Sequence, residues 1–202
     1  MCKLIGIAGK ANSGKDTLGN FIKEIDQRYK IVKYADKLKD ITSLLIGCDR
    51  SMLEDREFKE TPLPEQWWVV KNPWGELTAY KKGMTISNAC ELIKTTPRLL
   101  LQKIGTECFR NIIHPDVWVN STFAEFNEDS RWVVTDVRFK NEIEKIKDNG
   151  GVVVRINRPG YEISSNHPSE IQIDTYPDYD LVINNVGSVD DLKSYAERII
   201  NS

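Results

Sequence analysis

The sequence predicts an α/β domain with a mostly parallel central sheet flanked by helices. Two observations support this prediction. Short apolar runs alternate with longer stretches in which apolar residues recur every three or four positions, and these are the periods of buried strands and amphipathic helices. Strands that alternate with helices along a chain form parallel sheets, because each helix returns the chain to the same end of the sheet.

The first such pair lies at the amino terminus. Residues 3–8 form a short apolar run that suits a buried strand, and a loop with two glycines follows directly. From Asp16 onward apolar side chains recur at helical spacing, at Leu18, Phe21, Ile22 and Ile25. The order of elements is therefore strand, glycine loop, helix.

Several elements are predicted in the next hundred residues. A strand is expected at residues 30–34, and Asp36 after it is a typical helix cap. The apolar residues of that helix are Leu38, Ile41, Leu44 and Leu45. Another helix is predicted to open at Ser87, and one more to begin at Pro97 and to be interrupted at Gly105.

The alternation continues in the last part of the chain. Residues 116–126 have a helical pattern, and residues 131–136 predict a strand that ends on the carboxylate of Asp136. The helix after it ends at the Asn-Gly-Gly signal of residues 149–151. The remaining elements are strands at 152–156 and 181–184 and a closing helix that carries Val189, Leu192, Ala196 and Ile199.

One stretch does not follow this alternation. Residues 48–83 begin with a run of charged residues and continue with three prolines and three tryptophans at no clear period. This composition predicts an insertion or a mobile arm. The tryptophans Trp67, Trp68 and Trp74 either wall a ligand pocket or form an interface between subunits, and the sequence does not decide between these roles.

Composition excludes several classes of function. The formal net charge is −2 over 202 residues, which argues against a nucleic-acid-binding surface. No stretch has the ~18 apolar residues of a membrane span, and the amino terminus has no signal-peptide pattern, so we expect a cytoplasmic protein. The four cysteines contain no Cys-x-x-Cys pair and only two histidines accompany them, so a zinc site is not expected.

The most informative motif is the glycine loop, Gly-Lys-Ala-Asn-Ser-Gly-Lys-Asp-Thr. The spacing G-x-x-x-x-G-K between a strand and a helix predicts a P-loop, in which backbone N–H groups and a lysine bind the phosphates of a nucleoside triphosphate. Gly9 and Gly14 are expected to supply the tight backbone conformations, and Lys15 to contact the terminal phosphates. The predicted ATP contacts of the loop are Gly9, Ala11, Asn12, Ser13, Gly14, Lys15, Asp16 and Thr17.

Two carboxylates are candidates for a Mg²⁺ site. Asp16 occupies the position where the motif usually has a serine or threonine that touches magnesium, with Thr17 next. Asp16 can hold the metal, act as a base, or simply favour the helix N-terminus. Asp136 ends a strand, where open α/β sheets place ligands, and can alternatively cap a helix. The cations Arg138 and Lys140 follow it and suit a phosphorylated acceptor.

Six short motifs appear together in a fixed order over nearly the whole chain. They are GKANSGKDT, RLLLQKIGTE, PDVWV, VTDVRFKNE, RINRPG and DLVINN-x-GS. This ordered set resembles the deoxynucleoside monophosphate kinases of tailed bacteriophages, in which the Gly-Lys-Asp-Thr variant of the loop is typical. The resemblance implies a single P-loop kinase domain over residues 1–202, with an acceptor-binding arm at about 48–95 and a lid at about 158–178.

The resemblance implies a reaction and a set of site residues. The terminal phosphoryl group of ATP would pass to a deoxynucleoside monophosphate. The implied acceptor contacts are Lys39, Arg56, Arg98, Gly105, Thr106, Trp118, Asp136 and Arg138. For Arg56 and Arg98 a solvated surface role stays open, and for Trp118 plain core packing does.

The lid and the last strand carry further candidates. Arg158 is implied as an arginine that reaches the transferring phosphates, and the catalytic set is Lys15, Asp16, Arg138 and Arg158. His167 and Glu170 either fix the lid or lie in an ordinary loop. Asn184 and Asn185 border the adenine or serve in a turn.

The expected partners are small nucleotides, with neither nucleic acid nor membrane, and a homodimer is a family-level expectation. The location would be the host cytoplasm if the protein is viral. Two other functions stay open at this point. One is a different small-molecule P-loop kinase, of the phosphomevalonate or dephospho-coenzyme A type, and the other is a nucleotide-binding interaction module without catalysis.

Overall fold

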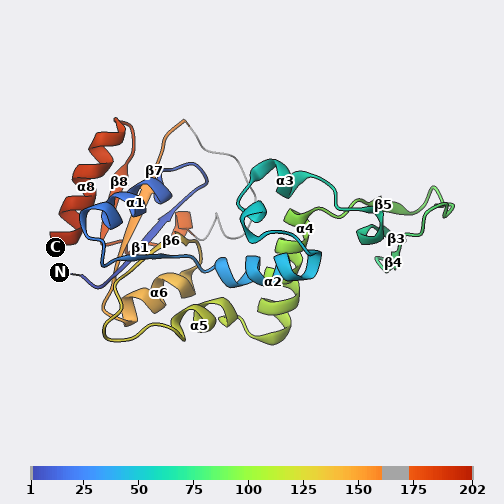
Figure 1. The fold of residues 1–202 in the computed structure, drawn as a ribbon, viewed down its shortest axis with the longest axis horizontal. Helices are drawn as coiled ribbons and strands as arrows, with labels where there is room; N and C mark the ends of the chain where they lie inside the picture. Colours follow the sequence, from blue (N-terminus) through green and yellow to red (C-terminus); the bar gives the residue numbers. More distant parts are fainter. Residues whose placement is uncertain (1, 161–172, 202) are drawn as a thin grey trace. The chain divides into compact units, whose positions relative to one another are not determined.

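The computed structural model describes residues 2–160 and 173–201, and the chain divides into two compact units (Figure 1). We call Met1–Asp36 with Trp118–Ser202 the sheet unit, and Lys37–Val117 the inserted unit. The arm predicted at about residues 48–95 falls within the inserted unit, which has wider bounds.

The sheet unit is built on a five-stranded sheet with the order β2-β6-β1-β7-β8, in which every pairing is parallel. Its strands are β1 (Leu4–Gly9), β2 (Lys30–Val32), β6 (Trp132–Val137), β7 (Val152–Asn157) and β8 (Leu181–Asn184). Its helices are α1 (Lys15–Ile25), α5 (Val117–Phe123), α6 (Lys140–Asp148) and α8 (Val189–Asn201). The predicted α/β fold with a parallel sheet flanked by helices is confirmed.

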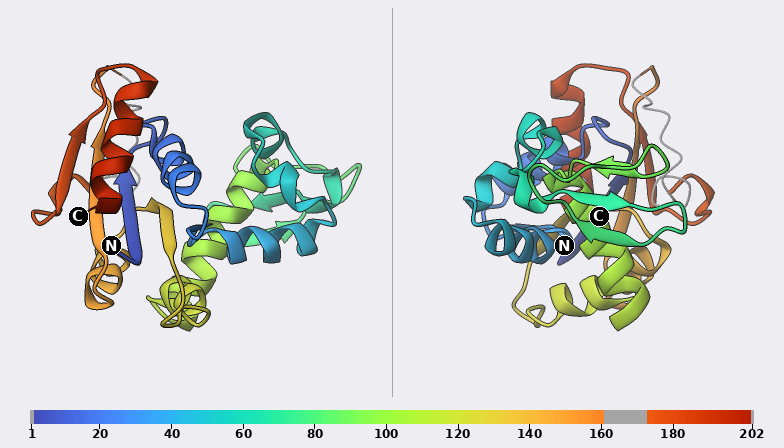
Figure 2. Two further views of the ribbon diagram at one scale, coloured as in Figure 1. Left: turned by 60° about the vertical axis from the view of Figure 1, so that its left-hand side comes forward. Right: turned by 90° about the vertical axis from the view of Figure 1, so that its right-hand side faces the viewer.

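Helices cover both faces of this sheet. On one face, Leu18 and Ile22 of α1 and Leu192 and Ala196 of α8 share a buried core with strand residues such as Ile7. Helices α1 and α8 are in contact with each other along this face, as Figure 2 shows. On the other face, residues of α5 and α6 pack on alternate strand residues, namely Val119, Ile143 and Ile146 on Leu4, Val134 and Val153.

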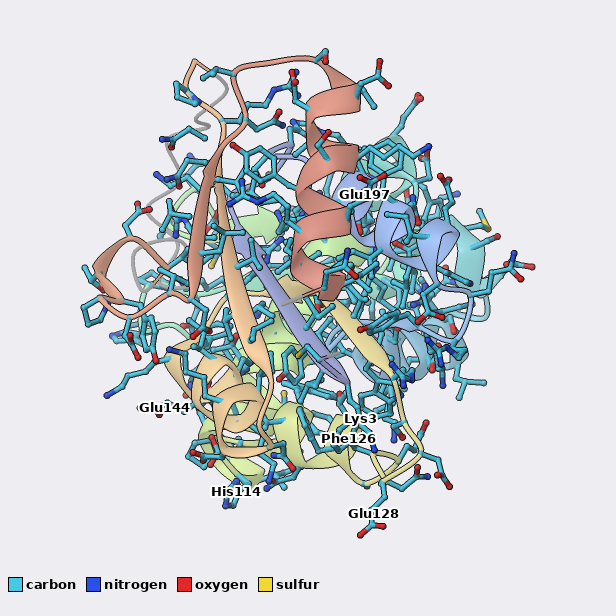
Figure 3. All side chains as sticks on the ribbon, turned by 90° about the vertical axis from the view of Figure 1, so that its left-hand side faces the viewer. Lys3, His114, Phe126, Glu128, Glu144 and Glu197 are labelled. Carbon is cyan, nitrogen blue, oxygen red and sulfur yellow. The ribbon has the colours of Figure 1, made fainter. Side chains whose placement is uncertain are left out.

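The amino-terminal end of the sheet is closed by side chains. The Lys3 ammonium donates a hydrogen bond to the carbonyl of Glu128 at 2.7 Å, and Phe126 packs edge-on against Trp132 with ring centroids 5.0 Å apart. Figure 3 shows the labelled Lys3, Phe126 and Glu128 gathered at this end. The phosphate loop leaves the opposite, carboxyl end of β1.

A β-bulge interrupts the pairing of β1 and β6. Gly6 pairs with Val134 but Ala8 pairs with Val137, so Thr135 and Asp136 stand opposite a single residue of β1. The extra residue moves Val137 into the same core as Val134, although strict alternation would place it on the other face. The bulge thus determines where the side chains of Thr135 and Asp136 point, close to the glycine loop.

The inserted unit contains short helices and a small antiparallel sheet of order β4-β3-β5. Its helices are α2 (Asp36–Ile46), η1 (Arg50–Leu53), α3 (Arg56–Glu60), η2 (Glu65–Trp67), α4 (Pro97–Gln102) and η3 (Lys103–Ile113), of which η3 is a π-helix. Its strands are β3 (Val69–Lys71), β4 (Leu77–Ala79) and β5 (Glu91–Ile93). The segment at 48–83, which showed no period, therefore has regular secondary structure.

Two predictions for this unit were wrong. Ser87 does not open a helix; its hydroxyl accepts a bond from the amide of Ala89 at 3.3 Å in a turn that leads into β5. Serine favours such turns because its side chain bonds to nearby backbone groups. Gly105 does not interrupt a helix either, because α4 runs directly into η3. A Cβ atom at Gly105 would lie 2.8 Å from the end of the Leu38 side chain, so a larger residue there would displace that side chain.

The tryptophans of this unit differ in their surroundings. Trp68 donates from Nε1 to the carbonyl of Leu63 at 2.7 Å, lies against Tyr80, and has the Lys94 ammonium 5.1 Å from its ring centroid. Trp68 therefore fixes the small sheet to the preceding segment. Trp74 is 85% exposed in the turn between β3 and β4. None of the described helices combines the length and the apolar character that a membrane crossing requires.

Candidate active site

The carboxyl ends of β1 and β6 form the place where a ligand is expected. These two strands are neighbours, but the chain leaves β1 toward α1 on one face of the sheet and leaves β6 toward α6 on the other. Strands whose connections leave to opposite faces create a crevice at their carboxyl ends, and open α/β sheets bind ligands there. The predicted phosphate loop and Asp136 lie at these two strand ends.

The loop owes its shape to particular backbone conformations. Gly14 has φ of 106° and Asn12 has φ of 61°, both in the left-handed region. Gly9 was predicted to supply a tight backbone conformation. The structure shows that a glycine is needed there for another reason, namely lack of space for a side chain. A Cβ atom there would lie 2.6 Å from both the carbonyl of Ile156 and the hydroxyl of Ser13. The loop can therefore lie against β7 only without a side chain at residue 9.

Lys15 begins helix α1 and is only 8% exposed. Its Nζ donates a hydrogen bond to the carbonyl of Lys10 at 2.5 Å, so the side chain folds back over the loop. Gly14 at the helix cap has no side chain to accept bonds from the first amides of α1. Those amides and the positive end of the helix dipole form an anion site.

Asp16 takes part in a small network at the same end of the sheet. The Lys33 ammonium lies 2.8 Å from Asp16 Oδ1, and the Thr135 hydroxyl donates to the same oxygen at 3.1 Å. Burial acts to raise the pKa of Asp16, but the bond and charge of Lys33 outweigh it and hold the pKa below its ordinary value. Asp16 is therefore a carboxylate at neutral pH.

Lys33 and Thr135 were not among the site residues predicted from the sequence. Lys33 directly follows β2, and Thr135 stands one residue before the predicted Asp136 in β6. The sequence did contain a signal for these two residues, since each is a polar residue near the carboxyl end of a predicted strand. Such residues meet at one edge of the sheet when their strands are parallel neighbours. What the sequence does not give is the strand order that makes β2, β6 and β1 neighbours.

Asp136 supports the backbone of the connection between β2 and α2. Its two carboxylate oxygens accept bonds from the amides of Tyr34 and Ala35, at 2.9 Å and 3.0 Å. Burial raises the pKa of Asp136, although these two bonds and the charge of Arg138 act in the opposite direction. The backbone amide of Arg138 donates to Glu142 at 2.7 Å, which fixes the turn into α6.

The far side of the loop meets groups from β7 and β8. Arg158 donates from Nη1 to the carbonyl of Asn12 at 3.3 Å, and Asn185 donates from Nδ2 to the carbonyl of Ser13 at 2.9 Å. Asn184 accepts a long bond of 3.5 Å from Asn157. The structure thus brings two residues predicted from separate motifs onto the phosphate loop.

The structure does not test the predicted roles of His167, Glu170 and Trp118. His167 and Glu170 lie outside the described residues, as does the part of the predicted lid from 161 to 172. Trp118 belongs to the sheet unit and is only 4% exposed. Burial is what core packing predicts for this side chain, and its contact with an acceptor stays a prediction.

The inserted unit contains the other predicted acceptor residues: Lys39, Arg56, Arg98, Gly105 and Thr106. Lys39 lies 2.6 Å from Glu54, which also pairs with Arg50 at 2.6 Å. Burial acts to raise the pKa of Glu54, but its bonds to Lys39 and Arg50 lower it to about 2. Arg98 pairs with Glu60 in a short contact. Lys39 and Arg98 are therefore each paired with a carboxylate of their own unit.

A phosphate loop on the central strand of a parallel sheet, with a buried lysine and a carboxylate beside it, defines the class of P-loop kinases. The family model for deoxynucleotide monophosphate kinase matches residues 71–196. The chain belongs to the deoxynucleotide monophosphate kinase family. The predicted phosphotransferase function, kinase action on deoxynucleoside monophosphates, is thereby confirmed.

Several curated proteins are similar to the chain over most of its length. A putative deoxynucleotide monophosphate kinase of Acanthamoeba polyphaga mimivirus is 29% identical, covering 95% of this chain and 92% of the relative. The deoxynucleoside-5'-monophosphate kinase of Escherichia phage T5 is 27% identical, covering 96% and 94%. The deoxynucleotide monophosphate kinase of Enterobacteria phage T4 is 28% identical, covering 95% and 96%.

Among solved structures, an unliganded sugar kinase from Janibacter aligns over 100% of this chain and 95% of its own. The sequence identity is 9% and the TM-score 0.40, so this likeness is too weak to define the fold. The parallel sheet and the phosphate loop define it instead.

Proposed function

We propose that the sheet unit binds ATP with Mg²⁺ on residues 9–17 and that the transferred phosphoryl group passes to a deoxynucleoside monophosphate. One observation carries the proposal: the phosphate loop of a deoxynucleotide monophosphate kinase family member has its lysine, Lys15, buried and folded back over the loop. A buried ammonium beside backbone amides is suited to a polyphosphate chain, because it neutralises charge in a site of low dielectric.

The ATP contacts that we propose on the loop are Gly9, Ala11, Asn12, Ser13, Gly14, Lys15, Asp16 and Thr17. Asn184 and Asn185 would border the adenine, and the bond from Asn185 to Ser13 supports this assignment because it ties the end of β8 to the loop. Arg158 would contact the transferring phosphate, and its bond to Asn12 supports that role.

The chemistry needs alignment and charge neutralisation more than covalent help. An oxygen of the acceptor phosphate attacks the terminal phosphorus of ATP, and the bond from that phosphorus to the bridging oxygen breaks. The products are ADP and a deoxynucleoside diphosphate. Lys15, Arg138 and Arg158 would neutralise the charge that develops on the transferred group and on the leaving oxygen.

Mg²⁺ would be held by Asp16, with Asp136 as a second candidate. Kinases commonly hold this ion by one or two carboxylates together with substrate phosphates, and Asp16 is an ionised carboxylate in the first turn of α1, so the residues fit. When bound, the ion supplies charge neutralisation at the phosphates. Lys33 and Thr135 would orient Asp16.

We propose acceptor contacts in each unit, and those in the sheet unit are Trp118, Asp136 and Arg138. The cations of the inserted unit are Lys39, Arg56 and Arg98, and the backbone at Gly105 and Thr106 would contact the sugar. Support comes from the carboxylate partners of Lys39 and Arg98, since a phosphate dianion can replace Glu54 and Glu60 as the partner of these cations. We further propose a homodimer, and the host cytoplasm as location if the protein is viral.

A substrate panel tests the function. Purified protein with ATP and each of the four deoxynucleoside monophosphates should release ADP with at least one of them. Arg98→Ala should lower kcat/KM for that acceptor by about 100-fold while the affinity for ATP changes little, because a charge-assisted bond to the acceptor phosphate is lost.

Lys71→Ala is the control for Arg98→Ala, since it removes an exposed cation of the same unit at a place outside the proposed site. It should leave both parameters unchanged. ADP release with none of the four acceptors would overturn the proposed function. A protein that binds ATP and hydrolyses it without dependence on the acceptor would be an interaction module instead.

A further inference from the structure

Three cations of the inserted unit gather around helix α3. Lys39 of α2 bonds to the carboxylate of Glu54, which lies just before this helix. Arg98 of α4 pairs with Glu60, the last residue of α3. Lys59, the residue before Glu60, is half-buried. Helix α3 lies against both η1 and α4 (Figure 1), so the three cations share one part of this unit.

Lys59 differs from the other two cations in its bonding. Its ammonium donates a hydrogen bond of 3.2 Å to the backbone carbonyl of Glu54, whose carboxylate is bound by Lys39 and Arg50. Among the residues that the structure describes, no carboxylate lies within ion-pair distance of Lys59. A lysine ammonium has three donors, so Lys59 has two donors to offer to a ligand.

The surroundings of Lys59 disfavour its charge. Burial lowers the pKa of Lys59, and the charges of Lys39 and Arg98 lower it further. Glu54 and Asp55 act in the opposite direction but do not reverse the shift. An ammonium that is partly removed from water, near two other cations and not paired with a carboxylate, is stabilised by an anion that binds to it. Groups perturbed in this way occur most often at functional sites.

The neighbouring ion pairs indicate the chemistry of that anion. Lys39 and Arg98 each hold carboxylate oxygens. A phosphate monoester carries up to two negative charges and three terminal oxygens, so it can bind several ammonium or guanidinium groups at once. It would have to replace a carboxylate at Lys39 and at Arg98, whereas at Lys59 it breaks no ion pair. The bond to Lys59 therefore adds to the affinity for a phosphate without that cost.

The place of Lys59 on its helix connects it with the acceptor. Arg56, one of the predicted acceptor contacts, begins α3, and Lys59 follows three residues later. Side chains three residues apart lie on the same face of a helix. Helix α3 therefore has two cations on one face, and only Arg56 was among the residues predicted from the sequence.

We propose that Lys59 is a further acceptor-binding residue of this kinase and that its ammonium contacts the phosphate of the deoxynucleoside monophosphate. The inference rests on the proposed function, in which cations of the inserted unit bind that phosphate. The carbonyl of Glu54 positions the ammonium. Lys59 adds affinity for the acceptor and takes no part in binding ATP.

Lys59→Met tests this role, because methionine keeps most of the length of the side chain and removes its charge and its donors. The KM for the accepted deoxynucleoside monophosphate should rise about 10-fold, the effect of one charge-assisted hydrogen bond. The kcat and the KM for ATP should stay near their wild-type values, since the lost bond serves acceptor binding alone. Lys81→Met, an exposed lysine between β4 and β5, is the matched control and should change neither KM.

Two further variants separate acceptor binding from a structural role. Lys59→Gln keeps a donor for the carbonyl of Glu54 but loses the charge, so its KM for the acceptor should rise as much as that of Lys59→Met. It also carries the test if Lys59→Met does not fold. Lys59→Arg keeps the charge, and its KM should stay within about threefold of the wild type. A wild-type KM in Lys59→Gln would mean that the side chain only holds Glu54, and this result overturns the proposal.

Calorimetric titration without ATP is the remaining arm of the experiment. At least one of the four deoxynucleoside monophosphates should bind about 10-fold more weakly to Lys59→Met than to the wild type. Equal affinities of the two proteins for these nucleotides overturn the proposal. If inorganic phosphate nevertheless binds only to the wild type, Lys59 belongs to a site for the free anion. A wild type that releases no ADP with any of the four acceptors would instead contradict the proposed function, so the two failures are distinguishable.

Discussion

Lys15 of the sheet unit and Lys39 of the inserted unit are both predicted to meet a phosphate, but the protein holds them differently. Lys15 is buried and bonded to a backbone carbonyl of its own loop. Lys39 is bonded to the carboxylate of Glu54, a side chain that is about half exposed. The phosphate loop, which we propose as the donor site and call the donor loop, is built from backbone, whereas the cations of the inserted unit are arranged by side chains.

This difference has a physical consequence. A site made of backbone amides is fixed by φ and ψ angles and by close packing, so few substitutions keep it intact. A site made of side-chain ion pairs can change by single substitutions of modest energy. We therefore expect the donor loop to tolerate little change and the inserted unit to be where acceptor preference varies among kinases of this family.

The largest expected effect is that of Lys15→Ala. Turnover should fall on the order of 10³-fold, because the variant lacks the buried cation that, in the proposed function, stabilises the transferring group. Steady-state kinetics measures the effect, and Lys23→Ala, at an exposed position of the same helix, is the control. Melting temperatures of the two variants close to that of the wild type would exclude unfolding, and turnover near the wild-type rate would remove the loop from the mechanism.

Two glycine substitutions compare the units directly. A Cβ at Gly9 meets the rigid backbone carbonyl of Ile156, whereas a Cβ at Gly105 meets the flexible end of the Leu38 side chain. Gly9→Ala should lower the free energy of unfolding by about 3 kcal/mol and Gly105→Ala by about 1 kcal/mol, measured by urea denaturation of the unliganded proteins. Equal losses would contradict the idea that the donor loop is the less adaptable of the two.

The smallest expected effect concerns Glu54 and pH. Its pKa is lowered from 4.5 to about 2 in the folded protein, so its ion pairs add stability above pH 4.5, and this stability is lost as the pH falls from 4.5 toward 2. Because Glu54 is about half exposed, Glu54→Gln should cost only about 0.5 kcal/mol at pH 7 and nothing near pH 2.

Urea unfolding at a series of pH values measures this difference, with Glu107→Gln, an exposed carboxylate of the same unit, as the control. A cost that stays constant down to pH 2 would mean that the network of Lys39, Arg50 and Glu54 does not stabilise the inserted unit.

Local patterns in the sequence were sufficient to predict the secondary structure at the amino terminus of this protein. The strand, glycine loop and helix from residues 3 to 25 follow from an apolar run, a fixed spacing of glycines and a helical period, all of which involve neighbouring residues. The alternation of strands and helices also predicted the parallel sheet. In the inserted unit, where turns compete with short helices and strands, the same reasoning placed a helix at Ser87 that does not exist.

The sequence by itself determined the class of fold, the phosphate loop and the family, because each depends on local spacing or on ordered motifs. Only the tertiary structure decided that Lys33 and Thr135 meet Asp16, and that a bulge in β6 turns Thr135 and Asp136 to their partners. These contacts depend on strand order and register, which are set by packing between residues far apart in the chain.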